Sequence, residues 1–101
     1  MSLKIDKDGN RKWYNSNGKL HREDGPAIER NNGRKAWWVD GQLHRIDGPA
    51  IEYNDGDKEW YKKGQLHRID GPAIEEANGN KYWYINGIEL TEEEYYAFKN
   101  R

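Results

Sequence analysis

The sequence predicts an all-β fold, an antiparallel meander of repeated β-hairpins that forms a single elongated, twisted sheet with a short C-terminal capping helix. Three observations support this prediction. A 23-residue unit occurs three times, short extended runs within it are separated by Gly, Asn and Asp at turn positions, and the pattern becomes helical after residue 88. We expect one domain covering residues 1–101.

Each repeat opens with a ten-residue block, Leu-His-Arg-x-Asp-Gly-Pro-Ala-Ile-Glu, in which only x differs between copies. The second half of the unit keeps a Gly, an aromatic pair beginning with Trp, and a closing Gly. Units of this kind bury surface mainly against their neighbours. The full repeats are residues 20–42, 43–65 and 66–88, preceded by a partial copy in residues 1–19 and followed by the helical cap in residues 89–101.

Two hairpin turns are predicted in every unit. The first, at Asn31-Asn32-Gly33 in the first repeat, is either a type I′ turn or a turn with a G1 bulge, since Asn and Gly tolerate positive φ. The second follows at Asp40-Gly41. The Asp-Gly-Pro of the block makes a third turn, and its Pro must begin a strand or lie in the turn because it has no N–H to donate.

The paired aromatics define two columns, because neighbouring residues in a strand point to opposite faces. We expect the first column to pack on the buried face with the repeated Leu and Ile, and the second column to lie on the other face, where it is the candidate binding surface. The first column is Trp13, Trp37, Trp60 and Trp83; the second is Tyr14, Trp38, Tyr61 and Tyr84; the Leu and Ile positions are 20, 43 and 66, and 28, 51 and 74.

The repeated His, Arg and Asp of the block are interpreted as structural. Asp suits turn chemistry because it accepts backbone N–H bonds, Arg can pair with that Asp or with the Glu that ends the block, and the His ring can pack between Trp residues of successive units. Three identical copies fit structural supports better than catalytic groups. These residues are His21, His44 and His67; Arg22, Arg45 and Arg68; and Asp24, Asp47 and Asp70.

The same spacing argues against an enzyme or a metal protein. A His beside a carboxylate can act as a general base. Equivalent atoms of successive repeats, however, should lie roughly 10 Å apart, from strand spacings of about 4.8 Å, whereas metal-bound imidazole nitrogens must all lie about 2 Å from one ion. There is also no glycine-rich phosphate loop leading into a helix. We expect no catalysis, no metal and no cofactor.

The C-terminal residues have the features of a helix over about residues 91–99. Thr91 is a good N-cap residue, and Glu94 stands where a capping box places its carboxylate. The acidic first turn suits the helix dipole. Tyr95 and Phe98 share one face of this helix. We expect this face to cover the open end of the sheet.

Composition excludes several classes of partner. The net charge is −1, with basic and acidic residues interleaved, so nucleic acid, which attracts basic surfaces, is disfavoured. No apolar run approaches a membrane span, and we expect neither membrane association nor a signal peptide. Cysteine is absent, which excludes disulfides and thiolate chemistry. We expect a cytoplasmic protein.

Two segments carry a family resemblance. Residues 83–87, Trp-Tyr-Ile-Asn-Gly, and residues 17–21, Asn-Gly-Lys-Leu-His, resemble the MORN repeat and the MORN-like repeats of bacterial YwqK-type proteins. The complete block, together with the closing Leu-Thr-Glu-Glu-Glu, looks more like uncharacterised repeat proteins of large tailed phages. The resemblance covers nearly the whole chain and implies a β-hairpin array used for binding.

We therefore expect a non-catalytic protein-interaction module of phage or bacterial origin, which blocks a host factor such as a defence component and acts, if phage-encoded, in the host cytoplasm. Tyr, Trp and Arg are frequent anchors of interfaces. One alternative is binding of a nucleotide or sugar by the aromatics and Arg22, Arg45 and Arg68. Another is self-association as a homodimer. Function should lie where the repeats vary: residues 23, 46 and 69, the turn tips, the second aromatic column and the helix.

Overall fold

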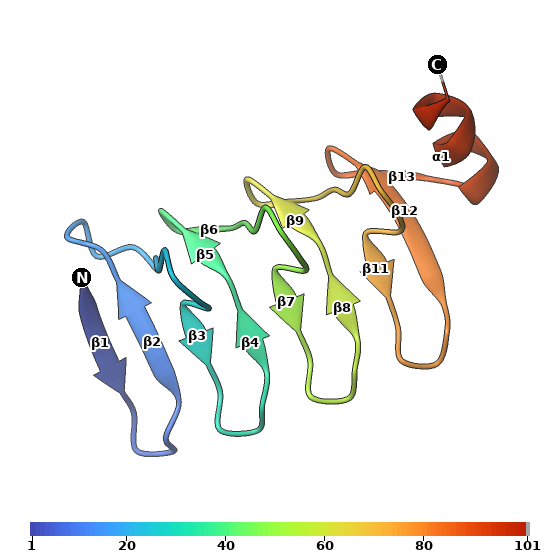
Figure 1. The fold of residues 1–101 in the computed structure, drawn as a ribbon. Coiled ribbons are helices and arrows are strands. Elements are labelled where there is room, and N and C mark those ends of the chain that lie inside the picture. Colours follow the sequence, from blue (N-terminus) through green and yellow to red (C-terminus); the bar gives the residue numbers. More distant parts are fainter. Residues whose placement is uncertain (101) are drawn as a thin grey trace.

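The computed structural model describes residues 1–100 and confirms the predicted fold class (Figure 1). The chain runs as an antiparallel meander of short strands and ends in a helix, α1 (Glu92–Lys99). The molecule measures 46 × 30 × 18 Å. Its thinness explains the charged composition, because a single layer of strands buries little side-chain surface compared with two packed layers.

Within residues 1–100 the main sheet has nine strands in the order β1-β2-β3-β4-β7-β8-β11-β12-β13. Two ladders of two strands lie above it, one in each of the first two full repeats. The main strands are β1 (Ser2–Ile5), β2 (Arg11–Tyr14), β3 (Ile28–Glu29), β4 (Lys35–Ala36), β7 (Ile51–Glu52), β8 (Lys58–Glu59), β11 (Ile74–Glu75), β12 (Lys81–Ile85) and β13 (Ile88–Leu90). The ladders are β5 (Trp38–Val39) with β6 (Gln42–Leu43), and β9 (Tyr61–Lys62) with β10 (Gln65–Leu66).

The nine-stranded sheet runs through the whole array, but the two ladders are separate from it, and Trp37 shows why. Its N–H donates to Ala50 in the next repeat (2.7 Å), whereas its carbonyl accepts from His44 (3.1 Å). Before this residue β4 pairs with β7, and after it β5 pairs with β6. The chain thus changes its hydrogen-bonding partner at the Trp of the aromatic pair.

The two predicted hairpin turns are present, with different geometries. In the first, Gly33 alone has a positive φ (96°), Arg30 N–H donates to Arg34 (2.9 Å) and Gly33 N–H donates to Arg30 (3.0 Å), which is a turn with a G1 bulge. In the second, Asp40 and Gly41 both have positive φ (49° and 78°), as a type I′ turn requires.

The G1 bulge reverses the predicted assignment of the aromatic columns. It sets Ile28 opposite Ala36, so Trp38, two residues further on, shares their face. A two-residue turn in the same loop would have placed Ile28 opposite Trp37, because a one-residue change of register exchanges the faces. The expectation that the first Trp column packs with the repeated Leu and Ile was wrong: the second column takes that place.

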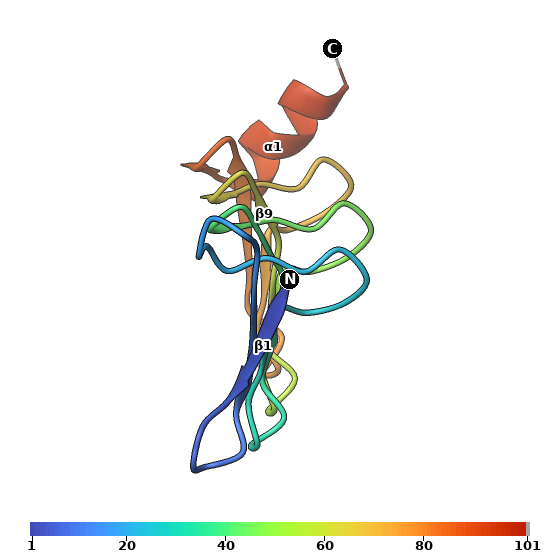
Figure 2. The same ribbon diagram turned by 90° about the vertical axis from the view of Figure 1, so that its left-hand side faces the viewer.

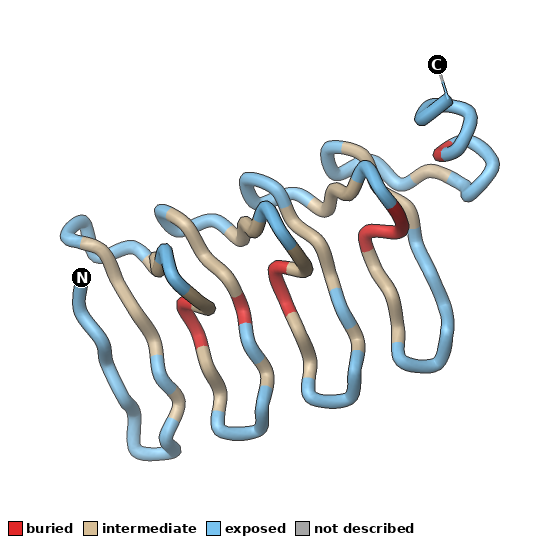
Figure 3. Tube along the Cα trace, viewed as in Figure 1, coloured by how far each residue is buried: buried red, intermediate tan, exposed pale blue. Residues whose placement is uncertain are grey.

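We call this the core face. Its centre is formed by Ile28, Ala36 and Ile51, which are at most 8% exposed. Leu43 lies opposite Trp38 across the β5–β6 ladder, and both pack against this cluster. Figure 3 shows buried residues recurring at the same height in successive repeats. The other partly buried residues that pack against this cluster are Leu20, Tyr53 and Tyr61.

The C-terminal helix forms as predicted. Thr91 is the N-cap, its hydroxyl accepts from the Glu94 N–H (3.0 Å), and the Glu94 carboxylate accepts from the Thr91 N–H (2.8 Å), which completes the capping box. The helix lies at the upper end of β12 and β13 (Figure 1) and buries Tyr95. Across residues 1–100, no helix has the length and apolar character needed to cross a lipid bilayer.

Candidate functional site

Three loops project from the face of the sheet opposite the core face. They are connector 1 (residues 20–27), connector 2 (residues 43–50) and connector 3 (residues 66–73), and each contains most of the repeated block. In the edge view of Figure 2 they bulge to one side of the sheet, whereas the tips of the second hairpins point to the other. We call the surface that carries them the connector face.

The Arg of each connector makes four contacts that fix the loop. In connector 2 the Arg45 guanidinium lies over the Trp37 ring, 3.7 Å from its centroid. Its Nε donates to Asp47 (3.3 Å), and its Nη1 donates to the Pro49 carbonyl (3.0 Å) and to Glu52 (3.2 Å). A cation on an aromatic face, bound to two carboxylates, holds the loop against the strand below it.

The other two connectors repeat this arrangement. Arg22 and Arg68 each lie 3.8 Å from the centroid of a ring of the first Trp column. Arg was predicted to pair with the Asp or with the Glu of its block, and in all three copies it pairs with both. The Asp carboxylate binds the Arg side chain, whereas we expected it to accept hydrogen bonds from backbone N–H groups. Three members of the first Trp column, Trp13, Trp37 and Trp60, are therefore structural and lie on the connector face.

The Gly of each block lets the Arg guanidinium lie close to the backbone. A Cβ added at Gly48 would lie 3.0 Å from the Arg45 Cζ, and one at Gly71 would lie 2.9 Å from the Arg68 Cζ. Such distances are shorter than almost all Cβ contacts, so a larger residue would shift the guanidinium from its position over the Trp ring. In the Asp-Gly dipeptide, the Asp thus pairs with the Arg, and the Gly lets the Arg guanidinium approach the backbone closely.

The repeated His residues join successive hairpins. His44 follows β6, and its Nδ1 accepts from the backbone N–H of Lys63 (3.0 Å), which begins the type I′ turn of the following β9–β10 ladder. His21 and His67 make the same bond to Asp40 (3.0 Å) and Asn86 (2.9 Å). Burial, reinforced by the charge of Lys62, lowers the pKa of His67. A ring nitrogen that accepts a hydrogen bond must be unprotonated.

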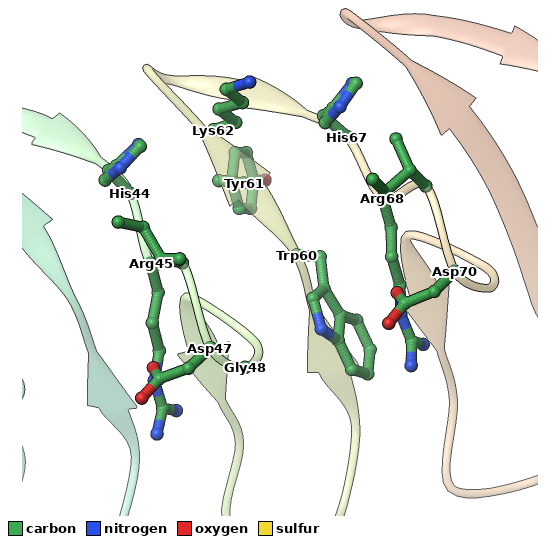
Figure 4. Close-up of a pocket in the computed structure, with 12 residues that line it drawn as sticks. His44, Arg45, Asp47, Gly48, Trp60, Tyr61, Lys62, His67, Arg68 and Asp70 are labelled. Atoms are coloured by element: carbon green, nitrogen blue, oxygen red, sulfur yellow. The ribbon is translucent and has the colours of Figure 1, made fainter.

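Grooves separate the connectors. Groove 1 lies between connectors 1 and 2, with Trp37 in its lining and a volume of about 820 Å³. Groove 2 lies between connectors 2 and 3, with Trp60 in its lining and a volume of about 770 Å³. In Figure 4, Arg45 and Arg68 run side by side in groove 2, with Trp60 between them. Both volumes lie in the range of about 300–1,000 Å³ typical of ligand sites.

Two isoleucines stand beside the grooves in contact with water. Ile46 is 92% exposed and Ile69 is 66% exposed, and both line groove 2. The sequence marks their position as the single variable one in the block, with Glu23 in connector 1. It does not reveal the grooves, because these form between residues 23 positions apart that only the sheet register brings together.

The second aromatic column, predicted to bind, lies on the core face and is half-buried. Trp38 and Tyr61 pack against the apolar cluster. The hydroxyls of Tyr53 and Tyr61 both donate to Glu59 (3.3 and 3.0 Å), and burial, with this carboxylate, raises the pKa of Tyr61. The flanking members of the column, Tyr14 and Tyr84, are also half-buried.

Together, the fold and the site define a β-hairpin repeat protein in which ordered loops border two grooves. In the part of the chain that the structure describes, no cluster of three or more His, Asp or Glu residues is arranged to hold a metal ion. Comparison of the chain with models of protein families, with curated proteins and with solved structures found no match.

Proposed function

We propose that this protein is a non-catalytic protein-interaction module whose partner binds the connector face. One observation carries the proposal: Ile46 and Ile69 are strongly exposed beside a groove lined by Trp60. Large apolar side chains gathered beside a concave site mark a protein–protein contact. The second aromatic column is the weaker candidate, because Trp38 and Tyr61 already pack against the core.

Within the block, different residues hold the loop and face the solvent, and this supports the choice of the connector face. The invariant Arg, Asp and Gly hold the loop, as the contacts of Arg45 show. The variable residue touches water and is free to differ between repeats without affecting the fold. The resemblance to repeat proteins of tailed phages makes a bacterial host protein, including a defence component, the partner class that we propose to test first.

A phosphorylated ligand such as a nucleotide has less support. The Arg residues that could meet a phosphate are each bound to two carboxylates, and Arg45, for example, is bound to Asp47 and Glu52. A phosphate would have to displace these partners from a guanidinium that is mostly covered. The same ion pairs reduce the attraction of the connector face for nucleic acid.

The test is affinity purification from bacterial lysate with the wild type and with the double variant Ile46→Glu/Ile69→Glu. These substitutions copy Glu23 of connector 1, so the repeat itself shows that the loop tolerates them. We expect the wild type to retain specific proteins that the double variant loses. Ile88→Glu is the matched control, because Ile88 is 66% exposed, as is Ile69, but lies in β13.

The control variant should retain the same proteins as the wild type. Equal retention by the wild type and the double variant would place the partner on another surface. In that case Trp38→Ala tests the core face. Light scattering coupled to size exclusion, applied to the same variants, shows whether the partner is instead a second copy of this chain.

A further inference from the structure

Helix α1 inserts one side chain into the connector face. Tyr95 is fully buried, although the helical residues around it are exposed. Its hydroxyl donates to the Arg68 carbonyl (2.8 Å) and accepts from the Gly71 N–H (3.0 Å). Burial raises the pKa of Tyr95, so the hydroxyl keeps the proton that it donates. Connector 3 therefore already binds a tyrosine side chain, which its own chain supplies.

Connectors 1 and 2 present the same backbone groups without a tyrosine. The equivalent pairs are the Arg22 carbonyl with the Gly25 N–H, and the Arg45 carbonyl with the Gly48 N–H, because Arg-x-Asp-Gly is repeated. Among residues 1–100, none of these four groups has a hydrogen-bond partner. An unpaired backbone group that is taken out of water costs free energy.

Both pairs belong to the linings of the grooves. Arg22 and Gly25 line groove 1, and Arg45 and Gly48 line groove 2. A partner that covers a groove must therefore offer an acceptor to the N–H and a donor to the carbonyl. A phenol hydroxyl does both with one oxygen atom. The phenol ring also suits the Trp in each groove, because aromatic pairs gain from offset or edge-to-face contact.

Glu23 makes the rim of groove 1 more acidic than that of groove 2, because Asp24 and Asp47 are already paired with Arg22 and Arg45. The Glu23 side chain is 82% exposed. Groove 2 has a more apolar rim, with Ile46 and Ile69 exposed, and its lining includes Lys62. A segment with basic residues next to its tyrosine fits groove 1, and one with apolar residues there fits groove 2.

We propose that grooves 1 and 2 each bind a tyrosine side chain of a partner polypeptide, in the way that connector 3 binds Tyr95. The hydroxyl bridges the Arg carbonyl and the Gly N–H, and the ring lies beside the Trp of the groove. This inference rests on the proposed function and specifies the chemistry of the partner. Two grooves in successive repeats favour a partner that offers two such side chains, which raises the overall affinity through effective concentration.

The experiment is an amide NMR titration of the full chain with N-acetyl-L-tyrosine amide. We expect saturable shifts of the Gly25 and Gly48 amides, whereas the Gly71 amide, already bound to Tyr95, stays in place. N-acetyl-L-phenylalanine amide, which lacks the hydroxyl, should bind about tenfold more weakly, because two hydrogen bonds are lost. In Tyr95→Ala the Gly71 amide should begin to respond as well.

Three results would overturn the inference: no response at Gly25 and Gly48, an equal response to the phenylalanine compound, or shifts of these amides that follow the concentration of the protein alone. The last would identify a second copy as the occupant. The wild-type titration decides the matter even if Tyr95→Ala fails to fold. Loss of a partner in Ile46→Glu/Ile69→Glu, without a tyrosine response, would leave the proposed function standing and remove only this inference.

Discussion

The two faces of the sheet are stabilised by different interactions. On the core face, Ile28, Ala36 and Ile51 form an apolar cluster. On the connector face, Arg45 lies between Trp37 and two carboxylates. One face depends on removing apolar surface from water, and the other on charge-assisted hydrogen bonds at defined angles. Because the polar face leaves grooves and exposed tips, a protein with little core can fold and still expose shaped surface to solvent.

The largest difference between the faces should appear on truncating the core. Ile51 is 4% exposed, and Ile51→Ala should lower the free energy of unfolding by about 2–4 kcal/mol. Urea denaturation measures this loss, which should not change between low and high salt, since no charge is involved. Ile5→Ala in β1, where Ile5 is 59% exposed, is the control and should cost less than about 0.5 kcal/mol. Equal losses in the two variants would show that the apolar cluster does not stabilise the fold.

A smaller effect is expected on the connector face. Arg45→Lys keeps the charge but loses the planar contact with Trp37 and the Nε bond to Asp47. The free energy of unfolding should fall by about 1 kcal/mol. Arg11→Lys is the control, since the Arg11 side chain is 56% exposed and only 3.8 Å from Glu29, so its loss should be near zero.

The dependence of the stability loss on ionic strength distinguishes Arg45→Lys from Ile51→Ala. The Asp47 side chain is 87% exposed, so its contribution to wild-type stability is screened as ionic strength rises. The difference between wild type and Arg45→Lys should therefore shrink at high salt. A difference that is independent of salt would mean that the Arg acts through Trp37 and the Pro49 carbonyl rather than through Asp47.

The contrast between the faces also shows what could be predicted from the sequence. The turns, the alternation of Trp37 and Trp38, the Arg pairing and the Thr91 capping box follow from local residue patterns, and the structure confirms them. Which column packs on the core could not be predicted, because it depends on a single residue of register. Asn31-Asn32-Gly33 permits both turns, and the G1 bulge places Trp38, rather than Trp37, beside Ile28.

The grooves could not be predicted from the sequence. They need the spacing of the connectors, the projection of the loops from one face and the position of Tyr95, which only the assembled sheet supplies. Within residues 1–100 the Gly25 and Gly48 N–H groups have no hydrogen-bond partner. The sequence does not indicate this, since hydrogen bonding of a loop N–H depends on the folded geometry. The variable residue of the block was the one local signal, and it points to the rim of the grooves at Ile46 and Ile69.

The smallest expected effect concerns pH and again belongs to the connector face. Burial and Lys62 lower the pKa of His67, whose Nδ1 accepts from the Asn86 N–H. The unfolded chain, with a His pKa of about 6.5, then binds more protons than the folded protein as the pH falls through that value. Stability is therefore fully present above about pH 7 and declines below about pH 6.5.

His67→Asn separates this titration from other causes of acid destabilisation, because Asn offers an acceptor that does not titrate. Urea midpoints of the wild type and the variant, measured from pH 8 to pH 5, should differ by a constant amount above pH 7. Below pH 6.5 the wild type should lose stability faster. Ile51→Ala, on the core face, should follow the wild-type pH profile throughout. A constant difference between wild type and His67→Asn over the whole range would mean that His67 stabilises the fold by its shape and not by its unprotonated nitrogen.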